Sequence, residues 1–234
     1  MNKKVVLGLT IIFVLTLLFL PQVVGKDFLA LRGSGITFSN EALSEAGKEL
    51  GGLIKARFVT EKEQIESIAV LVNGFPIFEK HLLMACDFYQ AKNIPIDKAR
   101  IASEFIRAAA LAGEAQRRGV GVTIEDAFEY SIKEVHDGLE RQDPLLLSIL
   151  NGSGLTPEEF AEKVQLHSNH IMLNINALNE LLASDLNITK ELEQLTQEEM
   201  AIRNSYLDMK HQEIIAQASL EIINEKYQEW FKCP

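Results

Sequence analysis

The pattern of hydrophobic and polar positions changes character between residues 68 and 78. Residues 70–72 form a continuous apolar run, which is typical of a strand covered on both faces. Asn73 and Gly74 follow, and this dipeptide supplies the two positive-φ positions of a tight hairpin turn. Pro76 removes a backbone donor, so the second strand is short or lies at an edge. We therefore predict a β-hairpin over residues 68–78, with helices packed over it.

After the hairpin, apolar residues recur every three to four positions, which is typical of amphipathic helices. The spacing predicts helices over residues 79–91, 96–118, 123–139 and 156–182, and a last helix or helix pair over residues 189–231. The second of these helices is rich in alanine, so neighbours can approach it closely and we expect it to be central. The predicted fold class is mostly α, a helical domain with one short β-hairpin.

Local capping signals support boundaries of two of these helices. Asp97 is a favoured N-cap residue, and Gly119 stands where a helix turns left-handed at its end. Thr156, Pro157 and Glu159 give the strongest boundary, with a capping hydroxyl, proline at the first helical position and glutamate three residues beyond the cap.

The first 25 residues predict an export segment ahead of this fold. Lys3 and Lys4 precede an uncharged run over residues 5–20, and the small residues ending at Gly25 fit a cleavage site. A spanning helix needs about 20 apolar residues, so a cleaved signal peptide and a retained membrane-anchor helix both fit this run. In either case we expect the rest of the chain to be exported, to the outer face of the cytoplasmic membrane, the periplasm or the extracellular space.

Residues 26–67 show only a weak pattern, interrupted by five glycines, with room for one short helix around residues 40–50. Because glycine-rich chain is flexible, we expect residues 26–67 to form a tether. The predicted domain organisation is then residues 1–25 as signal or anchor, residues 26–67 as tether and residues 68–234 as the helical domain.

Charge narrows the range of partners. The formal net charge of −10 becomes −12 without residues 1–25, which contain Lys3 and Lys4 and no acidic residue. So acidic a chain is not expected to bind nucleic acid, whereas basic or neutral unfolded polypeptides are free to approach it.

Candidate chemistry is sparse. Cys86 and Cys233 fit no metal or redox spacing; in an exported protein they could form one disulfide, and a buried thiol at Cys86 is the alternative. His167 and His170 stand three apart on one predicted helix and could begin a metal site, but no third ligand stands one turn away. We therefore expect no catalytic residue, no metal and no cofactor.

Three phrases carry a family resemblance: Val-Asn-Gly-Phe-Pro-Ile over residues 72–77, Ala-Gln-Arg-Arg-Gly-Val-Gly-Val-Thr over residues 115–123, and Leu-Thr-Pro-Glu-Glu-Phe over residues 155–160. In this order, after an export segment, they resemble the N-terminal domain of SurA-type periplasmic chaperones and PrsA-type extracytoplasmic foldases. The resemblance covers roughly residues 68–182 and implies a helical chaperone domain.

The resemblance stops before the catalytic part of those families. Their helical domain is followed by parvulin-type prolyl isomerase domains, which contain strands, glycines and paired histidines. Residues 187–234 contain no glycine and fit helix instead, and residues 209–231 could correspond to the family's returning C-terminal helix. We therefore expect the chaperone module without isomerase activity.

Two functions follow. The first is a non-catalytic extracytoplasmic chaperone that binds unfolded or exported polypeptides in an apolar groove between hairpin and helices. The second is a membrane-anchored scaffold or assembly protein whose long C-terminal helices bind a fixed partner or a second copy. Adaptable or aromatic side chains are the candidate client-binding residues, with a place in the core as the alternative for the aromatic ones. These candidates are Met84, Phe88, Tyr89, Met172 and Met209.

Overall fold

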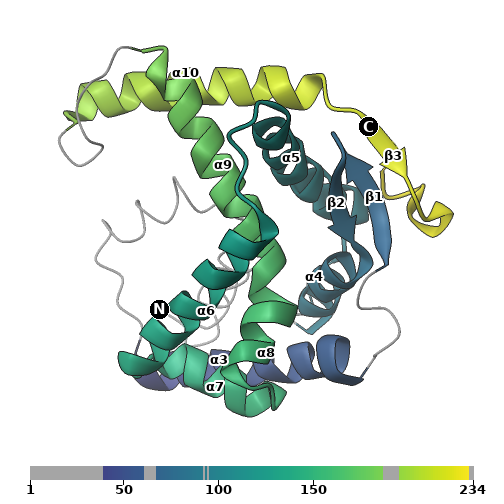
Figure 1. Ribbon diagram of the computed structural model, residues 1–234. Helices are drawn as coiled ribbons and strands as arrows, with labels where there is room; N and C mark the ends of the chain where they lie inside the picture. Colours follow the sequence, from purple (N-terminus) through teal and green to yellow (C-terminus); the bar gives the residue numbers. More distant parts are fainter. Residues whose placement is uncertain (1–38, 61–66, 92, 94, 187–194, 232–234) are drawn as a thin grey trace.

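The structure is a computed structural model that describes residues 39–60, 67–91, 93, 95–186 and 195–231. The described chain is mostly helical and carries one small antiparallel sheet (Figure 1). Its α-helices are α3 (Asn40–Ile54), α4 (Glu79–Ala91), α5 (Lys98–Arg117), α6 (Ile124–Glu140), α7 (Pro144–Ser153), α8 (Pro157–Phe160), α9 (Leu166–Ser184) and α10 (Gln197–Ala216). Its strands are β1 (Ile68–Val72), β2 (Phe75–Phe78) and β3 (Leu220–Ile222). The predicted signal or anchor over residues 1–25 lies outside the described residues.

The predicted hairpin is present as β1 and β2. Asn73 and Gly74 have φ angles of 51° and 79°, the left-handed values that a two-residue hairpin turn needs. The turn places Val70 opposite Ile77, and both side chains are buried. β1 is therefore a covered strand, as its continuous apolar run predicts.

The third strand, β3, corrects the prediction that residues 189–231 are helical to their end. α10 ends at Ala216, and the chain then returns to pair antiparallel with β1, which gives the sheet order β2-β1-β3. Leu220 pairs with Val72 at one end of this ladder. A short apolar run is compatible with either a strand or one face of a helix. Here the residues form a strand because β1 has an edge that β2 leaves unpaired, and β3 pairs with it.

α5 is the central helix, as its alanine content predicts. The Asp97 carboxylate accepts a hydrogen bond from the Arg100 N–H at 2.9 Å and so caps the first turn. Residues 108–112 are buried throughout. At Gly113 a Cβ would lie 3.0 Å from the carbonyl oxygen of Val72, so the absence of a side chain lets the hairpin seat directly on the helix.

α3 and α7 pack side by side, and they correct the expectation of a tether for residues 39–60, the part of the predicted tether in which the structure describes α3. A Cβ on Gly51 would lie 2.7 Å from the carbonyl oxygen of Ile149, so only glycine permits this approach. Leu50, on the same helix, is buried in the core. Within residues 39–60 the glycines therefore allow close helix packing instead of flexibility.

The helix predicted over residues 156–182 is present as α8, a π-helical turn over Ala161–Gln165 and α9. A complete capping box opens it: the Glu159 N–H donates to the Thr156 hydroxyl, and the Thr156 N–H donates to the Glu159 carboxylate, both at 3.1 Å. The π-helical turn accommodates one extra residue within an otherwise continuous helix.

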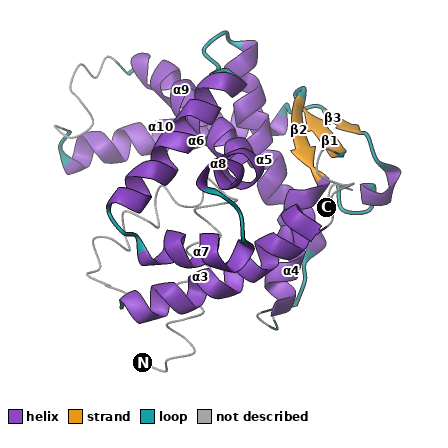
Figure 2. Ribbon diagram, turned by 60° about the horizontal axis from the view of Figure 1, so that its bottom comes forward, coloured by secondary structure: helices purple, strands orange, loops and turns teal. Residues whose placement is uncertain are grey.

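The elements surround one core, with the sheet at its side (Figure 2). In Figure 1, α10 crosses the top of the molecule above α9 and α5, whereas α3 and α7 lie at the bottom. After α10 the chain descends to β3 beside the hairpin. We refer to residues 197–231 as the C-terminal arm, since they reach from α10 across the sheet.

Candidate polypeptide-binding surface

The five candidate client-binding residues occupy different environments. Met84 and Phe88 are buried in the core, so neither faces a client in this conformation, and Phe88 takes the core position given as its alternative. Tyr89 and Met172 are half-buried. Met209 on α10 is exposed, and it is the candidate that a partner can reach most directly.

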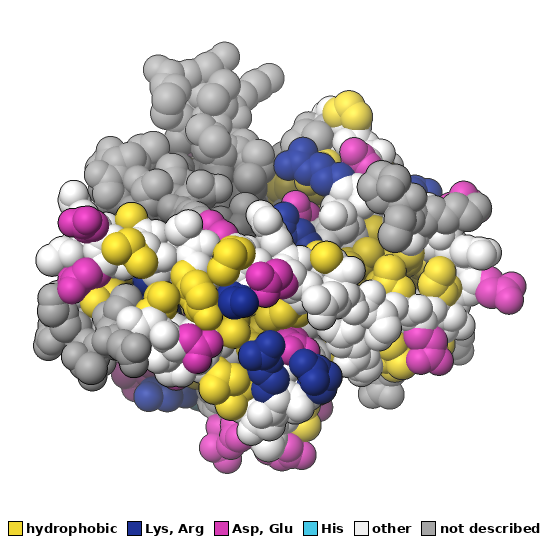
Figure 3. Space-filling view, turned by 90° about the horizontal axis from the view of Figure 1, so that it is seen from above, with side chains coloured by type: hydrophobic (Ala, Val, Ile, Leu, Met, Phe, Trp, Pro, Cys, Tyr) yellow, Lys and Arg dark blue, Asp and Glu magenta, His cyan; other side chains and the backbone are white. Residues whose placement is uncertain are grey.

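Exposed apolar surface is concentrated on the C-terminal arm. Five of the nine large hydrophobic side chains that are exposed in the described chain lie between residues 202 and 223. They are Ile202, Met209, Leu220, Ile222 and Ile223. Figure 3, which looks down on α10, shows hydrophobic side chains along the top of the molecule with acidic and basic side chains between them. Charged side chains between the apolar ones keep such a surface hydrated, and the apolar side chains can still contact a partner.

α10 carries two apolar stripes instead of one. Leu207 and Ile214, seven residues apart, are buried against the body. Ile202 and Met209 share a second stripe on a different side of the helix, where 53% and 47% of their surface is exposed. Tyr206 lies on this stripe and donates a hydrogen bond to the Asp185 carboxylate at 3.1 Å. The second stripe is therefore available to a partner while the first attaches the helix.

Asn73 in the hairpin turn fixes the beginning of β3. Its side-chain oxygen accepts a hydrogen bond from the Ser219 N–H at 2.9 Å, and its own N–H donates to the Ser219 carbonyl at 3.0 Å. Its side-chain amide donates to the carbonyl of Ala110 on α5 at 3.3 Å. One residue thus joins the turn, the central helix and the C-terminal arm.

Glu79, the first residue of α4, fixes the end of the arm from a buried position. The carboxyl group accepts hydrogen bonds from the side-chain amide of Asn224 and, at 3.0 Å, from the Tyr227 hydroxyl. Lys226 lies 3.4 Å from the same carboxyl group. Burial, and then the bond to Glu79, raise the pKa of Tyr227 well above its usual value.

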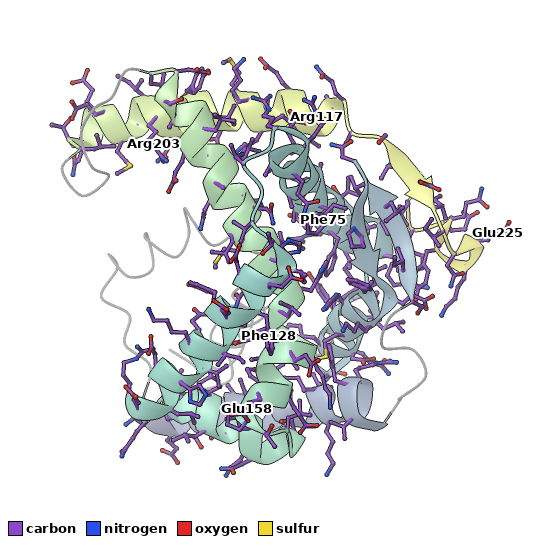
Figure 4. All side chains as sticks on the ribbon, in the orientation of Figure 1. Phe75, Arg117, Phe128, Glu158, Arg203 and Glu225 are labelled. Carbon is purple, nitrogen blue, oxygen red and sulfur yellow. The ribbon has the colours of Figure 1, made fainter. Side chains whose placement is uncertain are left out.

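Three histidines form an aromatic cluster beneath the hairpin. The rings of His81 and His167 stack with centroids 4.7 Å apart, and Phe78 meets His167 edge-on at 4.8 Å. Phe75 packs on His170 with centroids 5.2 Å apart, and Figure 4 shows Phe75 on the body side of the sheet. The cluster joins β2 and α4 to α9.

Burial controls the titration of this cluster. Desolvation, with smaller contributions from Lys80 and His170, lowers the pKa of His167 to about 3. Desolvation, followed by the neighbouring His167, also lowers the pKa of His81 well below its usual value. Both rings are therefore neutral at physiological pH and act as packing side chains.

The histidine pair considered as the start of a metal site has other partners. The His170 ring nitrogen Nε2 lies 3.0 Å from the carbonyl oxygen of Val122. Asn174, one turn later, accepts a hydrogen bond from the Val122 N–H at 3.1 Å. This side of α9 therefore holds the connection between α5 and α6. No group of three metal-ligating side chains is present in the described part of the chain.

Cys86 is half-buried and forms no disulfide within the described residues, and burial raises the pKa of its thiol. Cys233, with which a disulfide was one of the two alternatives, lies outside the described residues. The structure therefore describes Cys86 alone, as a small side chain packed at the margin of the core.

Sequence reasoning missed the residues that attach the arm. Glu79 stands at the start of a predicted helix, where an acidic side chain is usually exposed to solvent and interacts favourably with the helix dipole. Tyr227 lies within residues 189–231, for which the sequence predicts a helix or helix pair. The sequence does show an acid, Glu79, directly after a buried strand, and an Asn-x-x-Tyr spacing over residues 224–227. Neither signal indicates that Glu79 and Tyr227 form a hydrogen bond with each other.

Comparison with protein-family models, with curated proteins and with solved structures gave no significant match. Within the residues described, no helix has the length and hydrophobicity needed to cross a membrane.

Proposed function

We propose that this protein is an extracytoplasmic chaperone-like protein that binds unfolded or exported polypeptides without catalysis. The observation that carries the proposal is the concentration of exposed aliphatic side chains between residues 202 and 223, on an arm that is firmly attached to the core. The resemblance of residues 68–182 to SurA-type and PrsA-type domains supports it.

Binding on this surface is apolar and weakly selective. Burying apolar surface contributes roughly 25 cal/mol per Å², so several partly exposed side chains give modest affinity without a fixed sequence requirement. Met209 can adapt to irregular partners because its side chain is flexible. The acidic chain, with a formal net charge of −10, favours basic or neutral clients over acidic ones.

In this proposal His81 and His167 have no catalytic role. The histidines that could act in proton transfer are enclosed by phenylalanine rings and by each other. Their lowered pKa values keep them neutral across the physiological range. We therefore assign them to the core.

The test is suppression of client aggregation by the full chain held in lipid nanodiscs, with empty nanodiscs as the blank. We expect dose-dependent protection of several unrelated unfolded clients. Replacing Ile202 and Met209 together by serine should weaken client affinity by about thirtyfold, because each loses roughly 1 kcal/mol of apolar burial.

The matched control is Ile124→Ser, since Ile124 is exposed to 43% at the start of α6 and lies outside the arm. This variant should protect clients as well as the wild type. Equal loss in both variants, or no protection by the wild-type protein, would reject the arm as a client-binding surface.

A second candidate function is a membrane-anchored scaffold or assembly protein. The outward stripe of Ile202, Tyr206 and Met209 favours it, because an i, i+4, i+7 spacing is typical of one helix pairing with another. A scaffold would form a complex of fixed stoichiometry with one partner or with itself. Light scattering on the purified chain and on its cross-linked complexes measures their molar mass. A single mass of fixed stoichiometry indicates a scaffold, whereas a mixture of masses indicates weak binding to many clients.

A further inference from the structure

Among the residues that the structure describes, no strand pairs with the outer edge of β3, which carries exposed apolar side chains. β3 is the last strand of the sheet order β2-β1-β3, and Figure 2 shows it at the margin of the molecule. Leu220 and Ile222 are exposed to 37% and 36%, and Ile223, directly after the strand, is exposed to 48%. Natural edge strands are usually covered or blunted by charge, proline or a bulge.

The backbone of β3 presents hydrogen-bonding groups outward. Ser219 and Ile223 direct their ladder bonds inward, to Asn73 and to the carbonyl oxygen of Ala69. Since backbone groups alternate in direction along a strand, the N–H and C=O groups of Leu220 and Ile222 point away from β1. The part of the chain that the structure describes adds no further strand at this edge.

The edge is held in place before any partner arrives. Val70 pairs with Ile222 in the ladder, and the bonds of Asn73 fix the entry to the strand at Ser219. Tyr227 and Glu79 fix the exit through their buried hydrogen bond. A preformed edge loses little conformational entropy on binding, which favours the addition of a strand.

Charge argues against a second copy of this chain at the edge. In a symmetric antiparallel pairing of two β3 strands with full overlap, Glu221 lies directly opposite Glu221 of the other copy, and like charges so placed are destabilising. Glu225, which Figure 4 shows at the outer side of the arm, adds to the negative charge of this segment. The same carboxylates favour a basic partner.

We propose that the outer edge of β3 binds an extended apolar segment of a client, flanked by basic residues, which adds to the sheet as a fourth strand. This proposal rests on the proposed function and specifies how part of the client is held. The added strand hydrogen-bonds to Leu220 and Ile222, its alternate apolar side chains contact the side chains of these two residues on one face of the sheet, and its basic flanks face Glu221 and Glu225.

The test measures binding of a fluorescein-labelled synthetic peptide, alternating valine and threonine between pairs of lysines, to the full chain in nanodiscs by fluorescence anisotropy. A second peptide has the same side chains and an N-methyl group on every central residue, so that it lacks backbone donors. We expect the methylated peptide to bind about tenfold more weakly, because net backbone hydrogen bonds are lost while apolar contacts remain.

Two variants at one position test the same edge from the protein side. Ile222→Pro removes the outward N–H while the inward ladder bonds of its neighbours remain, and it should weaken peptide binding about tenfold. Ile222→Thr keeps the N–H and the branched shape and should bind within about threefold of wild type. Circular dichroism establishes that both variants are folded. The comparison of the two peptides uses the wild-type protein, so it does not depend on the folding of a variant.

Equal affinity for the two peptides, or equal weakening in the two variants, would overturn the strand-addition proposal. Self-association of the wild type that Ile222→Pro abolishes would also overturn it, in favour of a second copy at the edge. If the wild type suppresses client aggregation but fails these tests, only the strand proposal fails. If it also gives no suppression, the proposed function fails with it.

Discussion

At the scale of single residues, the stacked imidazoles of His81 and His167 make stability depend on pH. An unfolded histidine has a pKa of about 6.5, whereas burial lowers the pKa of His167 to about 3. Between these values the unfolded chain binds a proton that the folded chain does not, so stability falls as the pH falls from 6.5 towards 3. Above 6.5 both states are neutral at this ring and the contribution is constant.

We therefore predict that acidification from pH 6.5 to pH 5 costs about 2 kcal/mol through His167 alone, at roughly 1.4 kcal/mol per pH unit. His81 adds to the loss because its pKa is lowered too. Urea unfolding at several pH values, followed by circular dichroism, measures the effect. His167→Phe should make the loss smaller, and the control His136→Gln, on the exposed side of α6, should leave it close to wild type. Identical pH profiles for His167→Phe and wild type would contradict the prediction.

The sequence predicts single residues well where their partners are local. Asp97 and Thr156 cap helices as expected because each satisfies a backbone N–H three residues away. Met84 and Phe88 were misplaced on a client-binding surface because helical periodicity identifies an apolar face without saying what covers it. Glu79 was missed because its partners lie far away along the chain, at Asn224 and Tyr227.

At the scale of elements, the packing of α3 on α7 gives a matched pair of glycines. A Cβ on Gly51 would lie 2.7 Å from the Ile149 carbonyl oxygen, whereas a Cβ on Gly52 meets nothing within 4 Å. We predict that Gly51→Ala destabilises the protein by about 1–3 kcal/mol through overpacking. Gly52→Ala should stabilise it by about 0.5–1 kcal/mol through helix propensity. Thermal and urea unfolding measure both. Equal stabilisation by the two variants would mean that α3 is not packed on α7 in solution.

The sequence predicts those elements whose signals are local, and it does not predict those that depend on distant partners. The hairpin and α5 were predicted because the Asn73-Gly74 turn and the alanine-rich stretch are local signals. The sequence allows a short helix around residues 40–50 but places it in a flexible tether, because glycine spacing alone does not separate flexibility from close packing. β3 was read as helix because its partner strand lies about 150 residues earlier, as the pairing of Leu220 with Val72 shows.

At the scale of the whole molecule, the C-terminal arm closes the fold by returning to the hairpin and to the start of α4. The closing contact is the hydrogen bond from the Tyr227 hydroxyl to buried Glu79, 148 residues away in sequence. Trp230, the single tryptophan, lies beside Tyr227 with ring centroids 5.2 Å apart. Tryptophan fluorescence therefore reports on attachment of the arm, and circular dichroism reports on the helices of the whole protein.

We predict that the two signals change together when the wild-type protein unfolds in urea, since the arm completes the sheet. Tyr227→Phe should lower the unfolding free energy by about 1–2 kcal/mol, because it leaves a buried carboxyl group one donor short. Tyr206→Phe removes the same kind of hydroxyl from a bond at the surface and should cost no more than about 0.5 kcal/mol. If tryptophan fluorescence changed at lower urea than circular dichroism in the wild type, the arm would detach as a separate unit, and the client-binding surface would not be preformed.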